Sequence, residues 1–168
     1  VLPGLQAVEF EITCDLSAHL MAAVQRAEID LALVTLASRP GLAVAAKVVP
    51  LRWVRSGPLP DDARRAAYPE GCVCRRAMIG ALETAGESWQ VTVQSRSHAG
   101  IFAAVRAGIA VTSVAAGTAP PDLIEFDAAV GFPALPAVPV YLVAAPTLRR
   151  AGRDLRDRLM AELVLVAV

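Results

Sequence analysis

Apolar and charged residues alternate near the start of the chain, where Val8, Phe10 and Ile12 are separated by two glutamates. A repeat of two is typical of a strand with one face buried and the other face in solvent. The pattern therefore predicts a one-sided or edge strand over residues 7–13.

The next apolar residues, Leu20, Val24 and Ala27, recur at the spacing of one helix face. Ser17 precedes this stripe at the position where a hydroxyl caps the first free amides of a helix. We expect a helix that begins near Ser17 and, after it, a strand over residues 29–36.

Strands and helices alternate through the rest of the chain. The apolar runs predict strands over 42–46, 48–54, 90–94, 109–114, 122–126 and 140–144, and helices over 75–85, 97–107 and from about 148 onward. Gly86 and Gly108 stand where a left-handed residue ends a helix, and the proline-rich, charged segment 55–65 is typical of a loop. The alternation predicts an α/β fold with parallel sheets.

Composition narrows the class of protein. Apolar residues make up 55% of the chain and aromatic residues only 5%, which is typical of strands buried on both faces. Sixteen basic and sixteen acidic residues give zero net charge, so the chain lacks the positive field that holds nucleic acid. Four prolines in the uncharged stretch 128–148 would break a membrane-spanning helix. Three cysteines, an odd and small number, favour a reducing, cytoplasmic setting.

Few residues offer catalytic chemistry. The chain has two histidines, and the adjacent Ser97 and His98 would point in different directions on a helix, so they form no nucleophile–base pair. Cys72 and Cys74 have no second pair at a zinc-like spacing. Small thiols packed at a turn are the favoured interpretation, with a reactive thiolate at a helix start as the alternative. No glycine-rich phosphate loop occurs, and we predict no enzyme activity, metal or cofactor.

Polar residues recur where predicted strands lead into predicted helices. Ser17 precedes the first helix, Cys72 the second, and Ser95 and Ser97 the third. Free amides at helix starts, with hydroxyls beside them, can bind an anion, although ordinary N-capping explains any single serine. The recurrence at three junctions favours an anion site.

Seven short stretches, in order along nearly the whole chain, resemble a known family. They are Pro3–Leu5 leading into Val8–Ile12, Ser17 followed by Glu28–Leu33, Pro50–Val54, Tyr68–Arg75, Ser95–Ser97, Ala104–Val111 and Leu135–Pro139. Each stretch is weak alone, but the ordered series resembles the effector-binding domain of LysR-type transcriptional regulators. That domain shares its fold with type 2 periplasmic solute-binding proteins.

The resemblance implies an α/β fold of two lobes joined by two crossing strands, with an effector in the cleft between the lobes. Lobe I would comprise residues 1–51 and 142–168, and lobe II residues 52–141. It also implies that the family's N-terminal winged helix-turn-helix is absent from this chain, and that the first strand and helix of lobe I are missing or unseen.

The resemblance places effector-binding residues on both lobes. They would be Ser17 and Thr35 on lobe I, and Cys72, Arg75, Ser95, Ser97 and His98 on lobe II. Hydroxyls, amides and one guanidinium suit a small carboxylate-bearing effector. Arg75 has a structural alternative, an ion pair with Glu70. The other arginines of the two basic doublets, Arg64, Arg65 and Arg76, are expected on a solvated face.

The implied function is effector sensing and oligomerisation for a bacterial transcriptional regulator, as a homodimer or homotetramer that contacts DNA only through the missing domain and has no membrane partner. The apolar stripe of the last helix, Leu155, Leu159 and Leu163, fits either a dimer surface or the core. An extracytoplasmic solute-binding receptor of the same fold is the alternative from another class. The scarcity of histidine disfavours an enzyme.

Overall fold

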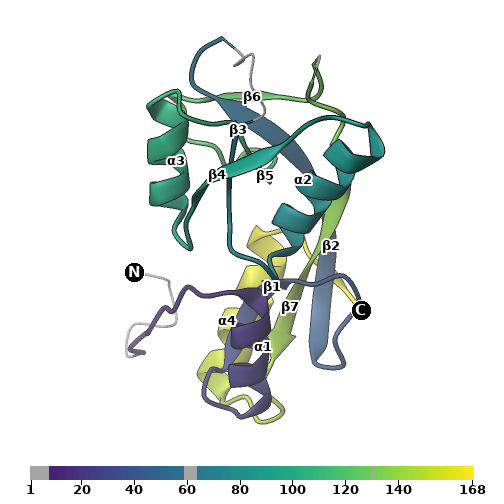
Figure 1. Ribbon diagram of the computed structural model, residues 1–168. Coiled ribbons are helices and arrows are strands. Elements are labelled where there is room, and N and C mark those ends of the chain that lie inside the picture. The colour runs from purple at the N-terminus through teal and green to yellow at the C-terminus, as the bar shows by residue number, and fades with distance from the viewer. Residues whose placement is uncertain (1–7, 59–63, 130) are drawn as a thin grey trace. The chain divides into compact units, whose positions relative to one another are not determined.

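The computed structural model describes residues 8–58, 64–129 and 131–168, and the chain divides into two compact units (Figure 1). Unit 1 comprises Val1–Lys47 and Pro139–Val168, and unit 2 comprises Val48–Val138. Both boundaries fall inside strands, namely β2 (Ala43–Arg55) and β7 (Ala137–Ala144). Each of these two strands therefore contributes residues to both units.

Helices and strands alternate in both units. Unit 1 contains α1 (Ser17–Gln25), β1 (Leu31–Thr35), the first part of β2, most of β7, α4 (Arg150–Glu162) and β8 (Val166–Ala167). Unit 2 contains the rest of β2, then β3 (Arg64–Ala67), α2 (Val73–Thr84), β4 (Gln90–Gln94), α3 (His98–Arg106), β5 (Thr112–Ala115) and β6 (Ile124–Phe126). No helix of the described ranges is long and apolar enough to cross a membrane.

The core of unit 1 is built on the antiparallel pair β1 and β7, which α1 and α4 flank (Figure 1). Successive side chains of a strand point to opposite faces. Val143 packs with Val24 of α1, whereas Leu142 packs with Leu159 of α4. The stripe predicted on the last helix therefore faces the core of its own unit, where Leu163 also packs.

The core of unit 2 depends on a parallel pair, β3 and β4, with α2 and α3 on opposite sides (Figure 1). Ala67 packs against Met78 of α2, and the preceding Ala66 packs against Ile101 of α3. Strand β5 lies beside β3, because the Ala66 amide donates to the Val111 carbonyl at 2.9 Å. The short alanine side chains of β3 allow both helices to approach the sheet closely.

Arg65 is buried in unit 2, with 2% of its surface exposed. Its guanidinium carbon lies 4.3 Å from the centroid of the Phe132 ring and 5.5 Å from that of Trp53, and its Nη2 donates to the Gly131 carbonyl at 3.2 Å. Aromatic faces and a carbonyl can stabilise a guanidinium away from water. The prediction of a solvated Arg65 is therefore wrong, and the side chain of Arg64 lies outside the described residues.

The strand predicted over residues 7–13 is wrong for its described part. Residues 8–16 have no regular structure, and the Ile12 side chain is 87% exposed. Alternation provides one apolar face, but a strand also needs a neighbour that pairs its amides and carbonyls. No described strand pairs with these residues.

Two other predictions about strands need correction. The strands predicted over 42–46 and 48–54 are one strand, β2, which continues through Pro50 because proline adopts extended backbone and its carbonyl still accepts a hydrogen bond, here from the Ala116 amide at 2.8 Å. The loop predicted over 55–65 ends in β3, which begins at Arg64. The four residues of β3 are too few to show a periodic pattern.

Parallel pairing is confirmed for β3 and β4 and wrong for the pairs β1–β7, β2–β5, β2–β6 and β2–β8, which are antiparallel. Parallel neighbours need a long crossover, usually a helix. The crossover from β3 to β4 contains α2 and meets this requirement.

Two leucines that face each other in the sheet of unit 1 provide a matched test of this core. Leu142 is fully buried, and its register partner Leu33 is 41% exposed. Leu142→Ala should lower the free energy of unfolding by about 2 to 5 kcal/mol because it leaves a cavity, and Leu33→Ala by less than about 1 kcal/mol. Urea unfolding followed by circular dichroism measures both, and equal losses would contradict the packing.

Candidate functional site

The candidate site in unit 2 lies at the edge of the sheet where β3 and β4 both end. Because the strands are parallel, Tyr68 and Ser95 follow their last residues at the same edge. The Ser95 amide donates to the carbonyl of Ala67 at 3.2 Å, which ties the two strand ends together. Helices α2 and α3 both begin within a few residues of this edge, so their free amides lie near it.

Arg75, in the first turn of α2, connects the two strand ends. Its Nη1 donates to the Tyr68 carbonyl at 2.9 Å and to Oε1 of Gln94 at 3.1 Å. Both hydrogen bonds leave from Nη1, so the Nε–Nη2 edge has no partner among the described residues. Among the described residues, Arg75 also forms no ion pair with Glu70. The edge that remains is the one that binds a carboxylate through two parallel hydrogen bonds.

Two serines organise the start of α3. Ser97 is the N-cap, and its hydroxyl accepts from the Ala99 amide at 3.2 Å. The Ser95 hydroxyl accepts from the Ser97 amide at 3.1 Å. It lies so close to the helix that a Cβ added at Gly100 would meet its Oγ at 2.6 Å. Gly100 therefore leaves the space in which Ser95 lies over the first turn.

Cys72 and Cys74 lie together at the start of α2, where Cys72 is the N-cap. A hydrogen bond from the Cys74 thiol, with smaller contributions from nearby backbone amides and the Arg75 charge, lowers the pKa of Cys72 to about 6 against the opposing effect of burial. The same hydrogen bond and burial raise the pKa of Cys74. The arrangement therefore favours a thiolate on Cys72 over one on Cys74.

Tyr68 and His98 form the apolar part of this edge. Their ring centroids are 5.2 Å apart in an edge-on arrangement, and His98 also lies 5.7 Å from Phe102. Burial lowers the pKa of His98, which favours the neutral imidazole. Burial, and after it the negative charge that Cys72 and Cys74 carry when ionised, raises the pKa of Tyr68. The Tyr68 hydroxyl is buried, and within the described residues it makes no hydrogen bond.

Ser17 and Thr35 lie together in unit 1. Ser17 is the first residue of α1, and its hydroxyl accepts from the Thr35 amide at the end of β1 at 3.0 Å. Leu16, rather than Ser17, is the N-cap, so the predicted capping role of Ser17 is wrong. Asp15 accepts from the Leu16 amide at 2.7 Å and pairs with His19, which leaves the serine hydroxyl to connect helix and strand.

The seven predicted site residues thus form two groups, a pair in unit 1 and five residues in unit 2. Tyr68, Cys74 and Gln94 also belong to the second group and are missing from the predicted site. Gln94 is the last residue of β4, and Tyr68 follows the last residue of β3. The sequence pattern does not reveal β3, so it gives no reason to include Tyr68 in the site. Within the described ranges, no three residues of the metal-ligating types come together.

Comparison with known protein families relates this architecture to one of them. The model of the LysR substrate binding domain matches residues 5–163. The chain belongs to this family. This is a family of transcriptional regulators. The match confirms the resemblance inferred from the sequence. A comparison with curated proteins gives no match.

Solved structures of LysR-type regulators share the fold. The Corynebacterium glutamicum OxyR C206 mutant has a TM-score of 0.64 and 15% identity over 96% of this chain and 56% of that chain. The Synechocystis PCC6803 CcmR regulatory domain in complex with 2-PG has a TM-score of 0.64 and 18% identity, over 92% and 83%. The effector-binding domain of QuiR in complex with shikimate has a TM-score of 0.68 and 9% identity, over 96% and 84%.

These likenesses confirm the predicted fold class, a mixed α/β domain of the type 2 periplasmic-binding-protein kind. The chain spans just over half the length of the OxyR chain. At such low identities the likeness shows the fold alone. The site residues of this LysR substrate binding domain therefore have to be assigned from the geometry of its own structure.

The thiol pair of this domain predicts a distinctive reactivity. In a Cys14→Ser background, the rate of iodoacetamide alkylation of Cys72 should rise with a midpoint near pH 6, which is its lowered pKa. Cys74→Ala removes the hydrogen bond that stabilises the thiolate, so the midpoint should move toward the ordinary value of about 8.5. Peptide mass spectrometry measures both rates, and a midpoint unchanged by Cys74→Ala would contradict the arrangement.

Proposed function

We propose that this domain senses a small, carboxylate-bearing metabolite for a LysR-type bacterial transcriptional regulator. The observation that carries the proposal is the unused Nε–Nη2 edge of Arg75 at the shared end of β3 and β4. Two hydrogen bonds hold the guanidinium in place, so it loses little further side-chain freedom when it binds a ligand. A planar carboxylate matches this edge.

Three neighbouring groups support the same ligand chemistry. The N-terminus of α3 carries partial positive charge, with Ser97 beside it. The buried Tyr68 hydroxyl gains a hydrogen bond if a ligand oxygen reaches it, which would offset an unsatisfied group that costs about 1 to 3 kcal/mol. Burial favours the neutral form of His98, which can donate or accept a hydrogen bond without adding a charge.

Relatives supply the context for a small effector. The CcmR regulatory domain is described in complex with 2-PG and the QuiR domain in complex with shikimate. Shikimate carries a carboxylate and several hydroxyls, a combination that the guanidinium and hydroxyls of unit 2 suit. We extend the proposal to Ser17 and Thr35 of unit 1, which the family resemblance also places among the effector-binding residues.

In the proposed mechanism, the effector shifts the regulator between two arrangements of its subunits. It can do so only to the extent that it binds one arrangement more tightly than the other. The domain would act in the cytoplasm as part of a homodimer or homotetramer, and DNA would be contacted by an N-terminal winged helix-turn-helix of the parent protein. In this role the domain binds its ligand without chemical conversion.

Substitutions at the Arg75 edge test the ligand site. A thermal-shift screen of small organic acids, shikimate included, should give at least one compound that raises the melting temperature. Arg75→Gln should weaken the binding of that compound at least about tenfold, because a charged hydrogen bond contributes about 1.5 to 3 kcal/mol. Ser97→Ala and Ser17→Ala should weaken it by smaller factors.

Arg76→Gln is the matched control, since it removes the same charge from the adjacent, exposed residue of α2. It should leave the affinity for the compound unchanged. Equal affinity for the compound in the unsubstituted, Arg75→Gln and Ser97→Ala domains would contradict the proposed site. Effector-dependent binding of operator DNA by the parent regulator, measured by fluorescence anisotropy, tests the regulatory role separately.

A further inference from the structure

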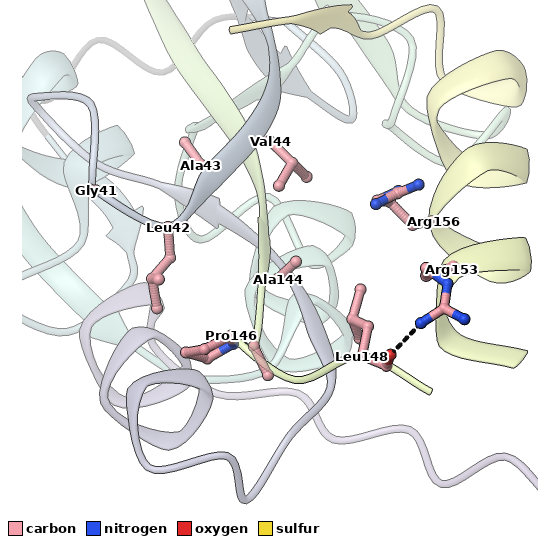
Figure 2. Close-up of a pocket in the computed structure, with 10 residues that line it drawn as sticks. Gly41, Leu42, Ala43, Val44, Ala144, Pro146, Leu148, Arg153 and Arg156 are labelled. Atoms are coloured by element: carbon pink, nitrogen blue, oxygen red, sulfur yellow. Dashed lines mark hydrogen bonds between the residues drawn. The ribbon is translucent and has the colours of Figure 1, made fainter. Parts of the chain in front are cut away.

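A pocket lies wholly within unit 1, between the start of β2, the end of β7 and α4 (Figure 2). Its volume is about 380 Å³, which is within the range of small-molecule sites. Leu42, Val44, Ala144 and Leu148 contribute apolar side chains to its lining. None of these residues belongs to the candidate effector site described above.

Two arginines of α4 form the polar wall of this pocket. Arg153 and Arg156 are three residues apart, so they lie on the same face of the helix, and Figure 2 shows both beside the apolar side chains. Arg153 Nη1 donates to the Leu148 carbonyl at 2.5 Å, and the described residues offer this guanidinium no carboxylate partner. Arg156 pairs with the adjacent Asp157, whose side chain is 63% exposed.

Gly152 determines the shape of the pocket wall. A Cβ added at this glycine would lie 2.9 Å from Cδ2 of Leu148, so only glycine leaves room for the leucine in its present position. Leu148 in turn offers its carbonyl to Arg153 and its side chain to the pocket. Gly152 leaves the space for the Leu148 side chain, and the Leu148 carbonyl holds the Arg153 guanidinium beside the pocket.

We propose that this pocket binds a small monocarboxylate with an apolar body, such as an aromatic or short branched acid. The apolar body would cover the side chains of Val44 and Ala144, and the carboxylate would accept hydrogen bonds from Arg153 and Arg156. An arginine that already holds one carbonyl keeps four further N–H groups for an anion. The inference goes beyond the effector site in unit 2 and does not depend on it.

Benzoate is the probe for this pocket, because it combines a carboxylate with a compact apolar ring. In a titration followed by ¹H–¹⁵N NMR, benzoate should shift the amides of Val44, Ala145 and Arg153. Arg153→Gln should weaken binding about tenfold, because it removes a charge-assisted hydrogen bond. Benzyl alcohol, which lacks the charge, and acetate, which lacks the ring, should each bind at least about tenfold more weakly than benzoate.

Arg150→Gln is the matched control, since it removes one positive charge from the same helix outside the pocket. It should leave the affinity for benzoate unchanged. Arg75→Gln should also leave it unchanged, which separates this pocket from the effector site of unit 2. Equal benzoate affinity in the Arg153→Gln and Arg150→Gln proteins, or shifts confined to amides around Ser97, would overturn the proposal.

Discussion

The parallel pairing of β3 and β4 is the constraint on which the candidate site depends. Parallel strands end at the same edge of a sheet, so the chain segments that follow them start side by side. The hydrogen bond from the Ser95 amide to the Ala67 carbonyl fixes this edge. Arg75 then connects both strand ends through Tyr68 and Gln94. Without this pairing, residues from α2 and α3 would not share one surface.

The buried aromatic side chains of Trp53 and Phe132 support β3, the strand that leads to this edge. Arg65 stacks on Trp53 and Phe132, and the Trp53 indole donates to the Pro133 carbonyl at 2.7 Å. A charged residue in the middle of a strand would normally weaken the core, because burying a charge is costly unless it is well satisfied. Here the two rings and a backbone carbonyl hold the guanidinium in place. Core and site are therefore connected through a single short strand.

The two units use the ends of strands and helices in different ways. In unit 2, the helix starts and the Arg75 guanidinium have donors without a partner among the described residues, which suits a ligand that exchanges with solvent. In unit 1, the Ser17 hydroxyl is engaged by the Thr35 amide, and the pocket beside α4 relies on the guanidinium of Arg153. Both arrangements fit the proposed recognition of a small molecule.

Much of this protein could be predicted from its sequence, because local patterns decide local structure. The apolar stripes and terminal glycines located α2, β4 and α3, and the ordered series of short motifs indicated the LysR family. Ser97 was recognisable as a helix cap, since capping needs a hydroxyl in that position, whereas Arg75 was indicated by the family resemblance.

Only the tertiary structure decided the remaining features. It placed Arg65 between two aromatic rings, added Tyr68 to the site, and left residues 8–16 without a strand despite their alternating pattern. In each case the outcome depends on a neighbour distant in the chain: a ring that covers a charge, a strand that brings a residue to an edge, or a partner strand that pairs an amide. A sequence pattern shows which faces of a helix or strand can be buried. Contacts between distant segments determine which of these faces are buried in the folded protein.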